Sequence, residues 1–168
     1  MKYNARYLTR AALIAALYTS LCYLQNALIP GSANWAIQFR AAEAMCVLAF
    51  FTPAAIPGLT IGCFAYNVSF AGALPLDFLV GSAATFLSVA ALRFTQKWRI
   101  GNYPLLSMLM PAIFNGIFIG WELSVYVGGG FLINCVYVFI GEAAVLLSLG
   151  TALYYAIKGR KLAQLLAG

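Results

Sequence analysis

The chain contains no histidine and only four carboxylates, which excludes several kinds of functional site. Histidine is the commonest transition-metal ligand and the usual general base in enzymes. The sequence also has no GxxxxGK[ST] loop, no HExxH and no GxSxG, the motifs of ATP hydrolysis, zinc proteolysis and serine hydrolysis. We therefore expect no metal, no cofactor and no enzymatic activity in this chain.

Charge is scarce as well, since 8% of the 168 residues are charged and 64% are hydrophobic. Soluble domains carry about 25% charged residues, so this composition predicts an integral membrane protein. The four cysteines are scattered without a CxxC pair and are typical of small buried hydrophobic residues. The net charge of +6 favours basic cytoplasmic loops over binding of nucleic acid.

Six apolar stretches are each long enough, or nearly so, to cross a bilayer, which takes about 20 residues. Proline and glycine mark most of their ends. The sequence predicts an all-α bundle of six transmembrane helices in a single membrane domain, 1–168, with spans at about 7–29, 36–52, 54–70, 76–95, 103–126 and 130–158.

Nine of the ten basic residues lie outside these stretches or within four residues of their ends, in three clusters. With six spans the clusters share one side of the membrane, and the positive-inside rule makes that side cytoplasmic. Both termini are then cytoplasmic. The clusters are Lys2, Arg6 and Arg10; Arg93, Lys97 and Arg99; and Lys158, Arg160 and Lys161.

The remaining cation, Arg40, and three carboxylates fall in the outer half of the membrane, and Glu142 falls near mid-depth. A carboxylate at the bilayer centre costs roughly 2.5–3.5 kcal/mol on insertion scales, so such residues are rarely incidental. The arrangement predicts a binding site open to the outside. The three outer carboxylates are Glu43, Asp77 and Glu122.

Two of these carboxylates also have structural interpretations. Arg40 and Glu43 are three residues apart and share a helical face, so they either hold a ligand or neutralise each other. Asp77 follows Pro75 at the start of a span, where a helix N-cap or first-turn acid is favoured.

Amides accompany the other two carboxylates. The spacing places Asn115 near the face of Glu122, and Asn134 beside Glu142, while Asn67 is a weaker candidate. Interhelical hydrogen bonding is the structural alternative for these residues. As a binding site, the set suits a ligand with several N–H donors or a cationic group. Trp121 and Tyr137 can stack a flat heterocycle, or can simply line the protein.

Small residues mark two helix faces. Gly58 and Gly62 form a small-xxx-small pattern in the third stretch. The first stretch carries two overlapping patterns near its cytoplasmic end, which predict either internal packing or docking of a partner membrane protein. These residues are Ala11, Ala12, Ala15 and Ala16.

Three runs of sequence resemble the QueT family, the queuosine-precursor substrate-binding (S) components of energy-coupling factor (ECF) transporters. They are IQFRAAEA at 37–44, IPGLTIGC at 56–63 with Asn67, and LDFLVGSAAT at 76–85. The resemblance implies a six-helix fold in the bacterial cell membrane that captures a 7-deazaguanine base, such as 7-aminomethyl-7-deazaguanine, from outside. It also implies a transmembrane coupling protein, docked on the alanine face, and two cytoplasmic ATPases that use the ATP.

Other functions remain open from the residues alone. An S component for another vitamin or nucleobase would carry similar groups. A self-sufficient proton-coupled carrier would use the buried glutamates as proton relays. A purely structural subunit would leave the outer carboxylates without a role.

Overall fold

The structure, a computed structural model, describes residues 5–32, 38–70 and 72–159. Within them every regular element is a helix, and none is a strand. The elements are α1 (Ala5–Leu28), the 3₁₀ helix η1 (Ala41–Phe50), α2 (Ala55–Ser69), α3 (Asp77–Thr95), α4 (Leu105–Tyr126), α5 (Phe131–Val145), the π-helical turn η2 (Leu146–Gly150) and α6 (Thr151–Lys158).

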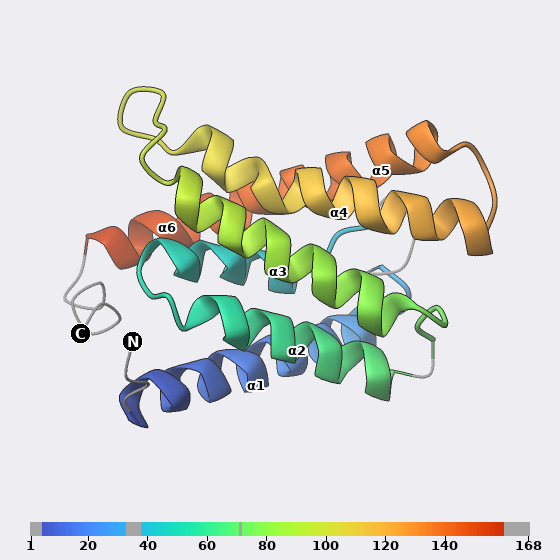
Figure 1. The fold of residues 1–168 in the computed structure, drawn as a ribbon, viewed down its shortest axis with the longest axis horizontal. Coiled ribbons are helices and arrows are strands. Elements are labelled where there is room, and N and C mark those ends of the chain that lie inside the picture. Colours follow the sequence, from blue (N-terminus) through green and yellow to red (C-terminus); the bar gives the residue numbers. More distant parts are fainter. Residues whose placement is uncertain (1–4, 33–37, 71, 160–168) are drawn as a thin grey trace.

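The long helices follow one another around the bundle in chain order, from α1 to α5, as Figure 1 shows. Each packs against the next, while η1 lies inside and contacts every other described helix. The last three elements form one continuous helix, Phe131–Lys158. The start of α1 and the end of α6 lie at the same end of the bundle (Figure 1).

Four helices are long and apolar enough to cross a membrane: Ala5–Leu28, Asp77–Thr95, Leu105–Tyr126 and Phe131–Lys158. The two others are shorter, and membrane crossing by η1 and α2 stays a prediction. Within the described part of the second predicted span, residues 38–52, the one helix is the ten-residue η1. A 3₁₀ helix rises about 2.0 Å per residue, so η1 extends about 20 Å, short of a typical 30 Å hydrocarbon core.

The interior position of η1 follows from its composition. Seven of its ten residues are buried, and its alanines let neighbouring helices approach closely. The 3₁₀ form is rarely kept over ten residues on its own, so tertiary packing must hold it. At its C-terminal end, the Arg93 guanidinium donates a 2.7 Å hydrogen bond to the Ala49 carbonyl, which satisfies one terminal acceptor.

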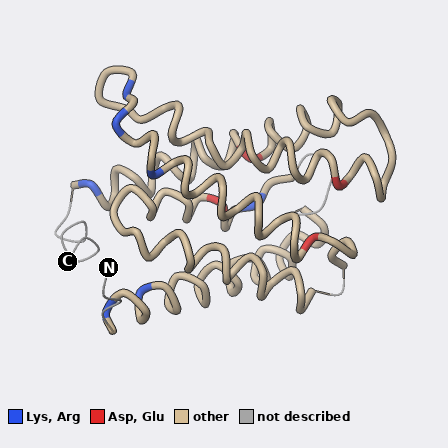
Figure 2. The backbone as a smooth tube through the Cα atoms, viewed as in Figure 1, with Lys and Arg blue, Asp and Glu red and all other residues tan. Residues whose placement is uncertain are grey.

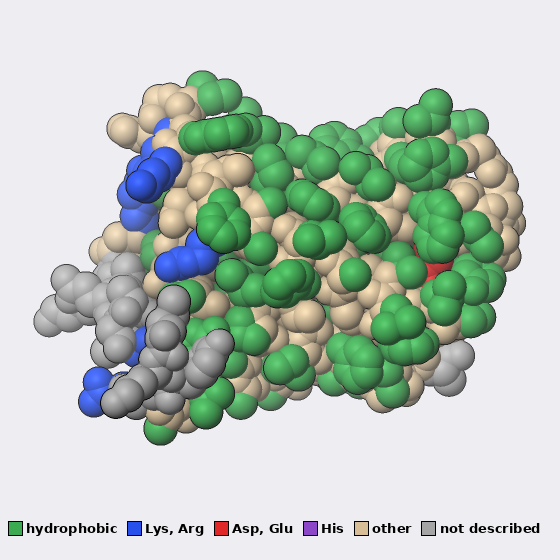
Figure 3. Space-filling view, in the orientation of Figure 1, with side chains coloured by type: hydrophobic (Ala, Val, Ile, Leu, Met, Phe, Trp, Pro, Cys, Tyr) green, Lys and Arg blue, Asp and Glu red, His purple; other side chains and the backbone are tan. Residues whose placement is uncertain are grey.

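Charge and apolar surface are segregated. All but one of the described Lys and Arg residues gather at one end of the bundle (Figure 2). Hydrophobic side chains cover the flank visible in Figure 3, as expected of a surface that contacts lipid.

The α1–α2 contact depends on the two glycines of α2. A Cβ atom at Gly58 would lie 2.8 Å from the Ala11 carbonyl oxygen, and one at Gly62 would lie 2.9 Å from the Ala15 carbonyl oxygen. The small-xxx-small patterns of the two helices therefore face each other, as in close transmembrane helix pairs.

We predict that Gly62→Leu lowers the melting temperature of the purified protein, because overpacking a tight contact costs about 1–3 kcal/mol. Gly130→Ala is the control, since a Cβ atom there meets only ordinary contacts at 3.6 and 3.8 Å. Equal melting temperatures for both variants in a detergent thermal-unfolding assay would contradict this packing.

Candidate functional site

A small polar cavity lies where α3 begins and α4 ends. These helix ends are opposite the ends near Arg93 and Arg99, so the cavity is remote from the basic end of the bundle. Its volume is about 80 Å³. It is lined by Gln38, Arg40, Gly72, Leu74, Asp77, Ile119, Glu122, Leu123 and Val127.

Arg40 and Asp77 face each other across this cavity. The Arg40 Nη2 and Asp77 Oδ2 atoms are 4.0 Å apart, and both side chains are buried. Arg40 precedes η1 with extended backbone angles (φ −85°, ψ 97°), so it does not share a helical face with Glu43 as its spacing predicted. Asp77 opens the first turn of α3, where the helix dipole favours a negative charge.

Glu43 has protein partners of its own. The Tyr18 hydroxyl donates a 2.5 Å hydrogen bond to one carboxylate oxygen, and the Cys46 thiol donates to the other at 3.2 Å. The glutamate is fully buried. The Tyr18 bond joins α1 to η1, whereas the Cys46 bond lies within η1, and both give Glu43 a structural function, whatever further function it has.

Glu142 is held in a similar way. The Asn115 amide nitrogen donates to both of its carboxylate oxygens, at 2.8 and 2.7 Å, across the α4–α5 contact. Spacing within each span paired Asn115 with Glu122 and Asn134 with Glu142. In the structure, the contact between α4 and α5 pairs Asn115 with Glu142 instead. Asn134 instead donates to the Gly128 carbonyl, in the loop between α4 and α5.

Glu122 differs from both. It is fully buried, it lines the cavity, and neither of its carboxylate oxygens has a hydrogen-bond partner among the described residues. The carbonyl oxygens of the Gln38 and Asn67 side chains are also buried without a partner. Buried polar atoms are almost always satisfied, so these unpartnered acceptors make the cavity a candidate binding site for a donor from outside the chain.

Asn67 and Gly81 complete this region. The Asn67 amide donates to the Asp77 backbone carbonyl at 2.9 Å. A Cβ atom at Gly81 would lie 2.8 Å from the Asn67 amide nitrogen and 3.2 Å from Asp77 Oδ1. Only a glycine leaves room there for both side chains.

The structure therefore gathers Arg40, Asp77 and Glu122 around one cavity, with Asn67 beside Asp77. Glu43, Asn115 and Glu142 are also buried, but they do not line this cavity. Among the residues that the sequence did not predict, Gln38 lines the cavity and Tyr18 binds Glu43. The one signal for Gln38 was its position two residues before Arg40.

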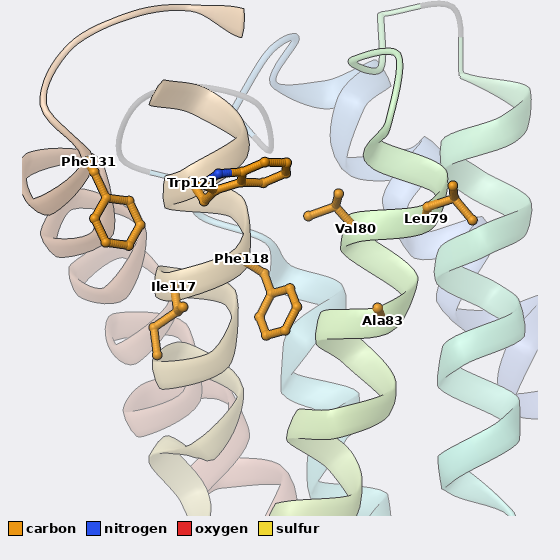
Figure 4. A pocket seen from close by; sticks show the side chains of 7 residues that line it. All are labelled: Leu79, Val80, Ala83, Ile117, Phe118, Trp121 and Phe131. Carbon is orange, nitrogen blue, oxygen red and sulfur yellow. The ribbon is translucent and has the colours of Figure 1, made fainter. Parts of the chain in front are cut away.

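Three predicted site residues lie elsewhere. Asn134 is half-buried in the loop contact, and the Tyr137 side chain on α5 is 41% exposed. Trp121 is 46% exposed. As Figure 4 shows, it extends from α4 toward Val80 on α3, in an apolar groove of about 490 Å³ with Phe118 one turn away. That groove offers a purely apolar lining and contains no carboxylate.

A second groove lies between α1 and α2, toward the basic end. Its volume is about 850 Å³, and Leu8, Ala12, Ile61 and Phe86 are among its lining residues. Of the four predicted docking alanines, Ala11 and Ala15 are buried against α2, while Ala12 and Ala16 are exposed. Packing against α2 accounts for the burial of the first pair, although Ala11 and Ala15 also line the groove together with Ala12, so docking of a partner stays a prediction.

The family model for the QueT transporter matches residues 8–159, nearly the whole chain. The chain belongs to the QueT transporter family. Comparison with curated proteins finds no match, and comparison with solved structures finds none. The QueT assignment makes the chain a membrane-embedded transport protein of the S-component type, and the expected resemblance is confirmed.

We predict that Asn115→Leu destabilises this QueT protein by about 1.5–3 kcal/mol, because it leaves the buried Glu142 without its donor. Restoring a neutral pair of similar shape, as in Asn115→Leu with Glu142→Met, should recover most of that loss. Thermal unfolding of the two variants checks it. A double variant no more stable than the single one would mean that the Asn115–Glu142 bond is not what the single change disrupts.

Proposed function

We propose that the chain is the substrate-binding subunit of an ECF-type ABC uptake transporter and captures a 7-deazaguanine precursor of queuosine from outside the cell. The observation that carries the proposal is Glu122, a fully buried carboxylate with both oxygens unpartnered at the wall of a polar cavity. The family match supports a transport function but does not name the ligand.

The chemistry of the cavity fits such a base. A guanine-like edge presents two parallel N–H groups, which one carboxylate can accept in a bidentate pair. The cavity lining has one cation, Arg40, and two carboxylates, so it also favours a positively charged arm such as an aminomethyl group. The unpartnered side-chain oxygen of Gln38, which lines the cavity, is a further acceptor for ligand N–H groups, and that of Asn67 lies outside the lining, beside Asp77.

Binding requires the cavity to enlarge. Small-molecule pockets are typically about 300–1,000 Å³, several times the 80 Å³ between these side chains. Gly72 and Leu74, before α3, and Val127, after α4, form part of the wall. We infer that these two connections move apart to admit a flat base and close over it.

The proposed topology has six spans, with the basic end in the cytoplasm and the cavity near the outer surface of a bacterial cell membrane. The gathering of basic residues at one end supports this orientation through the positive-inside rule. Transport then needs a transmembrane coupling protein and two ATPases, which supply the ATP chemistry that this chain lacks. The exposed Ala12 and Ala16 beside the α1–α2 groove are the proposed docking face.

The first experiment titrates the detergent-purified protein with 7-aminomethyl- and 7-cyano-7-deazaguanine, queuine, guanine and thiamine. A ligand at 100 times its Kd adds about 2.7 kcal/mol of stability. We expect stabilisation by a deazaguanine and at least a tenfold weaker Kd for Glu122→Gln, which loses the charge and one acceptor. Ser124→Ala is the control, because Ser124 is half-buried near the same end of α4 and does not line the cavity.

The outcomes separate the alternatives. Stabilisation by thiamine or guanine alone would assign another vitamin or nucleobase. No stabilisation, together with uptake by the chain alone in liposomes under a pH gradient, would support a proton-coupled carrier that uses the buried Glu43 and Glu142.

We predict that Ala12→Trp abolishes uptake by cells that carry the full transporter while leaving base binding by the purified chain unchanged. The indole would fill the α1–α2 groove without entering the cavity at the other end of the bundle. Leu13→Trp, on an exposed neighbouring position of α1, is the matched control. Uptake by the Ala12→Trp cells equal to that of the control would refute docking on this face.

A further inference from the structure

Gln25, near the end of α1, contacts the segment that carries Arg40 although it does not line the cavity. Its carboxamide oxygen accepts a 2.7 Å hydrogen bond from the Ala41 backbone N–H. Its amide nitrogen donates to the Phe39 carbonyl and, at 2.9 Å, to the Ser32 hydroxyl. One side chain thus bridges the two backbone groups that flank Arg40, and all its polar atoms are used.

The same segment is confined from the opposite side by α5. A Cβ atom at Gly141 would lie 2.2 Å from the Gln38 carbonyl oxygen and 3.0 Å from the Gln38 backbone nitrogen. No side chain fits at that position while the segment stays where it is. Residues 38–41 therefore pass between Gln25 and Gly141, with contacts on both sides.

This confinement determines where two cavity side chains point. Gln38 and Arg40 both line the cavity and precede η1, and the Arg40 carbonyl accepts a 3.0 Å hydrogen bond from the Glu43 backbone N–H in the first turn of that helix. The Arg40 backbone is extended, so its direction depends on the groups that hold Phe39 and Ala41. Two of the three side-chain hydrogen bonds of Gln25 are made to these neighbours.

We propose that Gln25 is a positioning residue for the binding site: by bridging Phe39 and Ala41 from outside the cavity, it aims Arg40 at Asp77 and sets affinity for the ligand. The proposal rests on the proposed function, since it assigns Gln25 to that same cavity. It predicts that ligand affinity depends on a residue that the ligand never contacts.

The test has a ligand-independent part. Hydrogen–deuterium exchange of ligand-free protein, read in a peptide containing Ala41, should show faster exchange of that amide in Gln25→Ala than in the unmodified chain. Asn26→Ala is the matched control, because Asn26 accepts a hydrogen bond from Gly31 N–H and makes none with residues 38–41 among the bonds described. Unchanged exchange in Gln25→Ala would refute the bridge itself.

The ligand-dependent part measures Kd for the stabilising deazaguanine in Gln25→Ala, Arg40→Gln and the double variant. If Gln25 acts through Arg40, each single change weakens binding at least tenfold and the double change is no worse than Arg40→Gln alone. Independent, multiplicative losses would overturn the positioning role. Absence of binding by the unmodified chain would refute the proposed function and, with it, this assignment of Gln25 to ligand affinity, while the exchange result would still decide the bridge.

Discussion

The arrangement of the molecule depends on a buried polar bond between a long helix and a short one. Tyr18 of α1 donates to Glu43 of η1, and η1 in turn contacts every other described helix. A 3₁₀ helix of ten residues has poor hydrogen-bond geometry and little stability of its own. It persists here because its polar groups are satisfied from outside, by Tyr18 near one end and Arg93 at the other.

The three buried glutamates fall into two kinds. Two of them have hydrogen-bond partners within the protein, and the third has none among the described residues and lines the cavity. Glu43 and Glu142 have their oxygens satisfied by neighbouring side chains, so removing a partner would expose an uncompensated buried group. Glu122 has no such partner and faces a cavity. In a chain with so few acids, this unpartnered carboxylate is the residue on which the proposed ligand binding rests.

Hydropathy and charge were enough to predict the helices, their approximate ends and the separation of basic and acidic groups. They could not predict the 3₁₀ form of η1, because an apolar run of this length and composition is equally compatible with an α-helix and a 3₁₀ helix. Spacing paired Arg40 with Glu43 and Asn115 with Glu122, yet Arg40 meets Asp77 and Asn115 meets Glu142. Both pairings are between elements, and periodicity within one helix contains no information about them.

The aromatic predictions failed to converge on the cavity for a related reason. Trp121 is on the same helix as Glu122, one residue earlier, and about 100° of rotation is enough to turn it from the cavity to the lateral groove. Sequence proximity therefore says little about shared sites on a helix that separates an interior from lipid.

Helix α1 contributes different residues to two surfaces, one exposed and one packed against α2. Ala12 and Ala16 give its exposed face small side chains, whereas Ala11 and Ala15 let α2 approach closely on the other side. Further along, Tyr18 and Gln25 hold η1 and the segment before it. Because α1 is a continuous helix of 24 residues, one element carries both the exposed alanines and the groups that contact Glu43 and the backbone on either side of Arg40. The proposed docking face and the hydrogen bonds to η1 and to the segment before it therefore lie on different faces and turns of the same helix.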